Sequence, residues 1–251
     1  MSLKSFYNQR YSLKLNNNIH RIKEIRIIDN LYYYKFIKNE LKKCKCKGKN
    51  IIDIGCGIAD HLKYLEKNSI AIDISEIALS NCNVNNRIVA DVTYLPIKSG
   101  SIDITLCIEM IEHLKIGDQV KAIAEICRIS NHNRLILISV PNESFHTCII
   151  CRIVNKLFKD SGHIGSFNKE KLFNLLNIQG FNNIKIYTHG FFSLGILLFF
   201  ERSLFLKKLI KKTKPVLKKM KIDRLIINFL FYETKILNHF FEGFRLVVVV
   251  R

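Results

Sequence analysis

A glycine turn and a downstream carboxylate are the residues whose spacing first suggests chemistry. Gly55 and Gly57 flank Cys56 directly after an apolar run that predicts a buried strand. Glycines let a ligand approach main-chain N–H groups at the start of the following helix. A second apolar strand, over residues 69–74, carries Asp73 near its end, close to the offset of about 20 residues at which a carboxylate meets a ribose in nucleotide-binding folds. These residues predict a site for an adenosine-containing cofactor.

Two carboxylates and an imidazole form the second group of residues that could take part in a reaction. Glu109, Glu112 and His113 follow a predicted strand at i, i+3 and i+4, a spacing that predicts one face of a short helix. His113 is the first candidate for a general base, with Glu112 as its orienting partner, and the alternative is that His113 only hydrogen-bonds a loop. The group also suits a divalent cation, with His163 as a further ligand, so the metal question stays open. His146 and His163 are secondary candidates for the pocket.

The sequence around the glycine turn resembles motif I of the class I S-adenosylmethionine (SAM) methyltransferases. In that motif an acid, here Asp53, stands two residues before the first glycine, and Ala59 occupies the place of the third glycine. Position 60 is Asp60, whereas a nicotinamide-cofactor fingerprint requires glycine there. The stretch from Asp91 to Leu114 resembles a sequence motif of type 11 methyltransferases, including those of ubiquinone biosynthesis.

The resemblance implies a cofactor, a reaction and a set of residues. The cofactor is SAM, and the acceptor is a small or lipid-like molecule methylated at oxygen. Asp91 is expected to accept the adenine amino group, and the backbone N–H of Val92 faces the ring. The complete set of implied cofactor-binding residues is Asp53, Gly55, Cys56, Gly57, Asp73, Ile74, Asp91, Val92 and Ile108. The implied catalytic residues are Glu109, Glu112 and His113.

The expected fold is an α/β, Rossmann-like, seven-stranded and mostly parallel sheet with helices on both faces and an antiparallel last strand. Apolar runs predict strands at residues 51–54, 69–74, 87–90, 102–108, 134–140, 183–188 and 244–250. Helical spacing predicts helices at residues 19–41, 59–66, 76–81, 120–128 and 169–177. One domain over residues 1–251 is expected, with an N-terminal helical cover (1–49) and a basic, apolar helical insert or lid (190–243).

The strongly basic balance, with a net charge of +19, leaves several partners open. Residues 191–200 of the insert are apolar but shorter than the roughly 20 residues of a membrane span. A lid packed on the domain and peripheral membrane contact through residues 191–231 are both consistent with the insert. RNA contact is less favoured because the lysine-rich run over residues 207–221 contains no aromatic residue. The alternative to a functional basic face is AT-rich coding, which alone produces a sequence rich in Lys, Ile and Asn.

Eight cysteines show no disulfide framework, and the first residues lack the apolar core of a signal peptide. The expected location is therefore the cytoplasm, with peripheral membrane contact as the alternative. Two other functions remain open beside the leading one. The first is a metal-assisted RNA ribose methyltransferase, which the charge and the Glu/His group favour. The second is a non-catalytic SAM-binding or membrane-associated interaction module.

Overall fold

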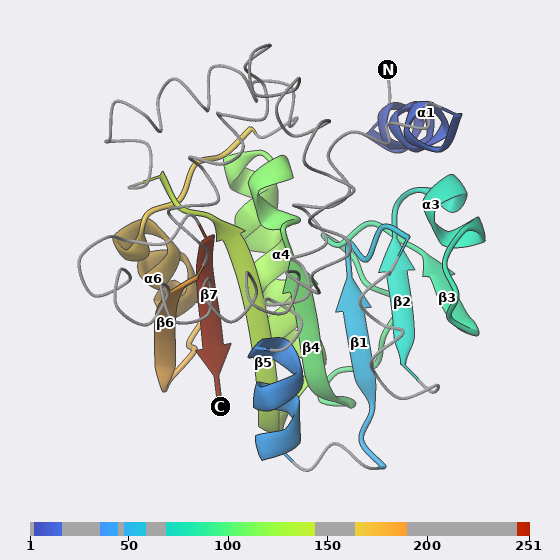
Figure 1. The fold of residues 1–251 in the computed structure, drawn as a ribbon. Helices are drawn as coiled ribbons and strands as arrows, with labels where there is room; N and C mark the ends of the chain where they lie inside the picture. Colours follow the sequence, from blue (N-terminus) through green and yellow to red (C-terminus); the bar gives the residue numbers. More distant parts are fainter. Residues whose placement is uncertain (1–2, 17–35, 45–47, 59–68, 144–163, 190–244) are drawn as a thin grey trace, which may run out of the picture.

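A seven-stranded sheet organises the computed structural model, which describes residues 3–16, 36–44, 48–58, 69–143, 164–189 and 245–251 (Figure 1). The strand order is β3-β2-β1-β4-β5-β7-β6. The strands are β1 (Ile51–Ile54), β2 (Ile70–Asp73), β3 (Asn86–Val89), β4 (Ile102–Ile108), β5 (Ser130–Pro141), β6 (Ile184–His189) and β7 (Arg245–Val250). Strands β1 to β5 pair in parallel, whereas β7 runs antiparallel to both β5 and β6. The predicted mostly parallel sheet with an antiparallel last strand is confirmed.

Helices cover both faces of this sheet. They are α1 (Leu3–Asn16), α3 (Glu76–Ser80), α4 (Ile116–Ile129) and α6 (Lys169–Ile178), together with the 3-10 turn η2 (Ile111–His113) and a helix over residues 36–43. Among the residues that the structure describes, no helix is long and apolar enough to cross a membrane. The predicted helix at residues 59–66 and the predicted insert at 190–243 lie outside the described residues.

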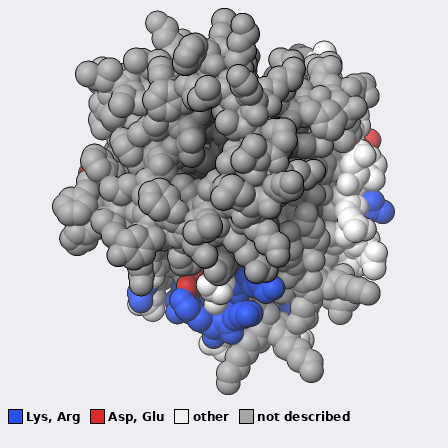
Figure 2. Space-filling model, in the orientation of Figure 1, with Lys and Arg blue, Asp and Glu red and all other residues white. Residues whose placement is uncertain are grey.

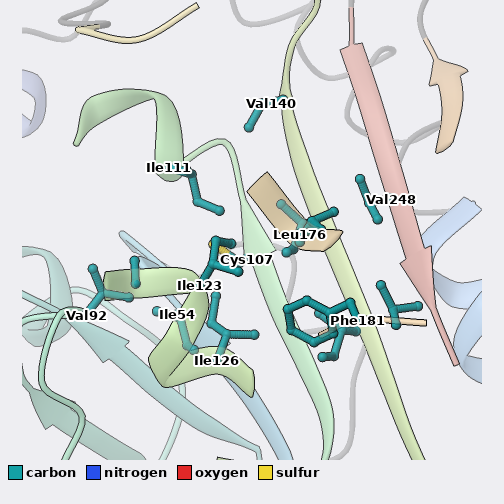
Figure 3. Packing of buried hydrophobic residues seen from close by; sticks show 14 of the residues in the cluster. Ile54, Val92, Cys107, Ile111, Ile123, Ile126, Val140, Leu176, Phe181 and Val248 are labelled. Carbon is teal, nitrogen blue, oxygen red and sulfur yellow. The ribbon is translucent and has the colours of Figure 1, made fainter. Parts of the chain in front are cut away.

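The sheet is apolar on both sides because alternate residues of each strand point to opposite faces. On one face, residues of β5 and β7 pack with α4 and α6 in a cluster that includes Ile136, Ile138, Val140, Val248, Ile123, Ile126, Leu176 and Phe181 (Figure 3). On the other face, the neighbouring residues of the same strands pack with the helix of residues 36–43 and with α3; this cluster includes Leu135, Leu137, Val247, Val249, Ile37, Leu41 and Leu79. Burial on both faces explains the nearly continuous apolar runs in the sequence.

Two elements begin four residues earlier than predicted, for different reasons. Helix α4 starts at Ile116 instead of residue 120, because its first turn exposes Ile116 to solvent and so breaks the apolar periodicity. Asp118 in that turn suits the positive end of the helix dipole. Strand β5 starts at Ser130 instead of residue 134, and its first residues are polar. The pairing of β5 with β4 is irregular there, with a register shift between Ile102 and Ile104 of β4.

The carboxyl ends of the parallel strands form the edge where ligands bind in open α/β sheets. The strand order reverses between β1 and β4, so the loops after these two strands diverge at that point. The glycine turn follows β1, and the Glu/His group follows β4. The topology therefore brings the glycine turn and the Glu/His group to the same edge of the sheet.

Candidate functional site

The glycine turn after β1 requires glycine twice. Gly55 and Gly57 have φ angles of 68° and 57°, in the left-handed region that side chains disfavour. A Cβ added at Gly55 would lie 2.2 Å from Cγ of Met110, and one added at Gly57 would lie 2.6 Å from the hydroxyl oxygen of Tyr11. The backbone N–H groups of Gly55 and Cys56 donate to the carbonyl of Ile72 at 2.8 and 3.0 Å. The turn is thus held against β2 and closely approached from two other segments.

Asp73, the last residue of β2, connects the glycine turn to the start of α3. Its Oδ2 accepts from the N–H of Gly57 and its Oδ1 from the N–H of Ser75, each at 2.8 Å. Burial raises the pKa of this carboxyl, and the two N–H donors act in the opposite direction. A carboxylate offers about four acceptor positions, so these two bonds leave capacity for the hydroxyl donors of a ribose. The arrangement fits the adenosine part of SAM.

The other residues predicted around the cofactor differ in how they are placed. Asp53 is fully buried in β1, paired with Ala71 of β2 and Leu106 of β4. The buried thiol of Cys56 donates to the carbonyl of Gly57 at 3.4 Å, and burial raises its pKa, so it behaves as a small apolar group. Two half-buried residues mark strand ends at this edge of the sheet, Ile74 after β2 and Ile108 at the end of β4.

Asp91 and Val92 begin the loop that follows β3. One carboxylate oxygen of Asp91 accepts from both the N–H and the hydroxyl of Thr93, at 2.9 and 2.8 Å, which stabilises the turn. The carboxylate is exposed, whereas Val92 is buried in the core cluster under α4. Contact of these two residues with an adenine ring stays a prediction.

Two residues of α4 fasten this loop to the domain. Glu125 accepts from the N–H of Leu95 at 2.7 Å. Arg128 donates to the carbonyls of Leu95 and Ile97 at 3.0 and 2.8 Å, and its Nε pairs with Glu125 at 2.6 Å. The ion pair therefore binds both the N–H and the carbonyl of Leu95, in the loop that carries Asp91.

Arg128→Leu is expected to lower the unfolding free energy by about 1–2 kcal/mol, since it removes hydrogen bonds from a charged donor to two backbone carbonyls. We also expect weaker SAM binding, because the Asp91 loop loses its attachment to α4. Thermal denaturation and calorimetric titration measure the two effects. Lys121→Leu, an exposed position on the same helix, is the matched control. Equal stability of the two variants would contradict the role assigned to Arg128.

Glu109 directly follows β4 and has an unusual backbone conformation. Its φ is 52°, and η2 begins only at Ile111, so the prediction that Glu109, Glu112 and His113 share one helical face is wrong. The left-handed turn directs Glu109 toward β5 and β7 instead. Its Oε1 accepts from the hydroxyl of Ser139 at 2.9 Å and lies 3.6 Å from Nε of Arg245.

Glu112 and His113 lie together on the short turn after β4. The Glu112 side chain is 1% exposed and that of His113 17%, and Nε2 of His113 lies 3.8 Å from Oε1 of Glu112. The backbone carbonyl of Glu112 accepts from the N–H groups of Ile164 and Gly165 at 2.9 and 2.8 Å. The ring of Tyr7 meets the His113 ring edge-on, with centroids 6.2 Å apart. His113 is therefore the more accessible member of the pair and faces α1.

Burial, followed by the charge of Glu109, raises the pKa of Glu112 well above its usual value, and Arg245 acts in the opposite direction. The unfolded chain loses this proton near pH 4.5, whereas the folded chain keeps it to higher pH. The folded state then binds more protons, so its unfolding free energy falls as pH rises through that window, by up to about 1.4 kcal/mol per pH unit. Glu112→Gln is expected to remove this decline in pH-dependent chemical denaturation. The exposed Glu170→Gln controls for the lost charge, and an unchanged slope in Glu112→Gln would contradict the prediction.

In the described part of the chain, no three His, Cys, Asp or Glu side chains are grouped so that they could hold a metal ion. His146 and His163, the further candidates for the pocket and for a metal, lie outside the described residues. A metal role thus remains a prediction, and no step below depends on one.

Several residues at this edge were not found from the sequence. Tyr7, Tyr11, Ser139 and Arg245 lie far from the motifs along the chain and reach the site only through the fold. Met110 lies between two predicted residues, but its contact with Gly55 depends on the path of the turn. No local pattern marks these five residues.

Comparisons with known proteins agree with this geometry. A sequence model of the methyltransferase domain, type 11, matches residues 52–138. An uncharacterised protein of Methanocaldococcus jannaschii is 30% identical over 173 residues, which are 68% of this chain and 70% of that protein. A chloroplastic tocopherol O-methyltransferase of Arabidopsis thaliana is 25% identical over 139 residues, 50% of this chain and 39% of that protein.

Among solved structures, a SAM-dependent methyltransferase of Archaeoglobus fulgidus superposes with a TM-score of 0.56 at 18% identity. The match covers 86% of this chain and 93% of the archaeal one, and it supports the fold. The motif around the glycine turn, the strand order and these matches agree on one family and on its cofactor. The chain belongs to the type 11 class I SAM-dependent methyltransferases.

Proposed function

We propose that this methyltransferase acts on an oxygen atom of a small or lipid-like acceptor, with His113 as the general base. The observation that carries the proposal is the position of the His113 imidazole. It is partly exposed at the carboxyl edge of the sheet, beside a buried carboxyl group and close to the strand that carries the glycine turn. A neutral hydroxyl is a poor nucleophile until a base takes its proton, and an accessible imidazole suits that task near neutral pH.

In this proposal, each group of the site has one task. SAM supplies a methyl group on a sulfonium ion, which needs no further activation. The glycine turn and Asp73 hold the adenosine end, so the methyl group is presented at a fixed place. The imidazole of His113 takes the proton of the acceptor hydroxyl, while Glu112, on the Nε2 side, orients the ring. Glu109 acts through Ser139 and Arg245 to shape the turn that carries both residues.

An oxygen acceptor of lipid character is supported by the similarity to tocopherol O-methyltransferase, a protein that is named for O-methylation. Within the described part of the surface, the Lys and Arg side chains do not gather at the candidate site, so they do not favour the RNA alternative (Figure 2). On the described surface that Figure 2 draws, Lys and Arg gather at the lower edge, where Figure 1 places the helix of residues 36–43 and the C-terminus. That edge is opposite the carboxyl ends of β1 and β4. The residues proposed for membrane contact, 191–231, lie outside the described residues.

The proposal is tested with methyl-labelled SAM and three acceptor pools. One pool holds lipids with phenolic or alcoholic hydroxyls, one holds small amines, and one holds structured RNA. We expect label in the lipid pool, with an equal amount of S-adenosylhomocysteine (SAH) released. Asp73→Ala serves as the inactive control. Label that enters only the amine pool or only the RNA pool would reject the oxygen-directed lipid function.

A further inference from the structure

Met110 is the residue through which the turn after β4 touches the glycine turn after β1. It directly precedes η2, which carries Glu112 and His113. A Cβ built on Gly55 would lie 2.2 Å from Cγ, 2.8 Å from Cβ and 3.6 Å from Sδ of Met110. These consecutive atoms of Met110 therefore occupy the space that a side chain at position 55 would fill. The methionine packs directly on the backbone of the glycine turn, and only a glycine leaves room for it.

Hydrogen bonds fix the backbone on each side of this contact. The N–H of Gly55 donates to the carbonyl of Ile72 at 2.8 Å, which holds the glycine turn against β2. The carbonyl of Met110 accepts from the N–H of His113 at 3.0 Å, which ties Met110 to the far end of η2. A displacement of Gly55 therefore acts on a residue whose own backbone is bonded to His113.

The core beneath the contact restricts both turns. Ile54 precedes Gly55, Ile111 follows Met110, and both isoleucines are buried in the same core cluster (Figure 3). The side chain of Met110 is half-buried and packs against that cluster. Protein interiors are packed so closely that a displaced side chain moves its neighbours. A shift of the glycine turn is therefore expected to move the turn that carries His113.

We infer that Met110 is a positioning residue of the transfer reaction, because its side chain sets the separation between the glycine turn and the His113 ring. SAM at the glycine turn fixes Gly55, Met110 rests on Gly55, and the position of His113 follows. The bound methyl donor thereby adjusts the opposite side of the site. An unbranched thioether suits this role because it fills irregular space and adapts to small shifts. The inference depends on the cofactor and holds whichever atom of the acceptor is methylated.

The first test follows the imidazole of His113 by NMR, with an isotope label at Cε1 of the eight histidines. The spectrum of His113→Gln identifies the signal that belongs to His113. We expect saturating SAH to shift this signal in the wild type and most of that shift to disappear in Met110→Ala. The shift should return in Met110→Leu, since leucine has nearly the volume of methionine and keeps the contact at Cγ. Thermal denaturation confirms that each variant is folded.

Leu175→Ala is the matched control for Met110→Ala. Leu175 is half-buried on α6 and packs against the same core cluster, so its truncation removes a similar amount of apolar packing away from both turns. We expect a comparable fall in melting temperature, with the SAH-induced shift of His113 retained. A purely structural role of Met110 predicts instead that the two variants give the same NMR response.

The second test measures the contact itself with a double-mutant cycle of Gly55→Ala and Met110→Ala. The methyl group added in Gly55→Ala meets Cγ of Met110, and it also strains a backbone whose φ is 68°. The strain is present with either residue at position 110, whereas the clash is relieved once Met110 is shortened. We therefore expect the melting temperature of the double variant to fall by less than the sum of the two single changes.

The inference is overturned if the two changes in melting temperature are additive, or if SAH does not move the His113 signal of the wild type. It is also overturned if Met110→Ala keeps the SAH-induced shift or if Met110→Leu loses it. The NMR comparison alone decides if Gly55→Ala does not fold. Neither test uses an acceptor, so failure of the oxygen-directed function does not affect the outcome.

Discussion

Asp73→Ala is expected to weaken SAM binding about 100-fold. In the predicted site the ribose would donate two hydroxyls to this carboxylate, and two charge-assisted hydrogen bonds of roughly 1.5 kcal/mol each would amount to about 3 kcal/mol. The side chain is 6% exposed and fixed by the N–H groups of Gly57 and Ser75, so it needs no rearrangement to receive the ligand. Calorimetric titration with SAM and with SAH measures the effect, which should be equal for both because they share the ribose.

The control for Asp73→Ala must separate ligand contact from folding. The substitution also removes the acceptor for two buried N–H groups, and we expect a fall in unfolding free energy of roughly 1–3 kcal/mol. Titrations are therefore run well below the melting temperature of the variant. The matched control is Asp118→Ala on the first turn of α4, which removes a carboxylate that pairs with Lys121 at 3.8 Å. Affinity that is unchanged in folded Asp73→Ala protein would reject the role of Asp73.

The sheet was predictable because the sequence pattern that marks a strand lies within the strand itself. Several strands, among them β1, β2 and β7, are short apolar runs, and β4 begins and ends where the pattern predicts, at Ile102 and Ile108. The glycine turn and Asp73 were predictable for a similar reason, since a left-handed backbone and a carboxylate at a strand end depend on residue type at fixed offsets. Elements with exposed or polar first residues, such as α4 and β5, were placed too late.

The contacts between distant segments were not predictable. Arg245 meets Glu109 only because β7 inserts between β5 and β6, and nothing in the residues around Arg245 marks that position. The helical spacing of Glu109 with His113 was misleading, because Glu109 takes a left-handed conformation before η2 begins. Ser139 donates to the Glu109 carboxylate and stabilises that conformation, and the pattern of apolar residues in β5 does not indicate this role. Sequence spacing therefore identified the residues of the turn but not its shape.

His113→Ala is expected to reduce kcat by a factor of roughly 100 to 10,000, the usual range for loss of general acid–base catalysis. Measurement uses SAH release with the acceptor that the labelled-methyl assay identifies. SAM affinity should stay close to that of the wild type, because His113 contacts Tyr7 and Glu112, on the acceptor side of the proposed site. The exposed His132→Ala on β5 is the matched control and should keep full turnover.

A base and a purely structural histidine differ in two further measurements. If His113 takes the acceptor proton, kcat of the wild type falls at low pH as the imidazole becomes protonated, and this limb disappears in His113→Ala. Added imidazole should then restore part of the lost turnover, because the substitution leaves space beside the partly exposed site. A structural histidine predicts neither effect, since an external base does not replace its contact with Tyr7. Turnover that survives in His113→Ala, or a loss that imidazole does not relieve while the pH limb persists, would assign the proton transfer to another group.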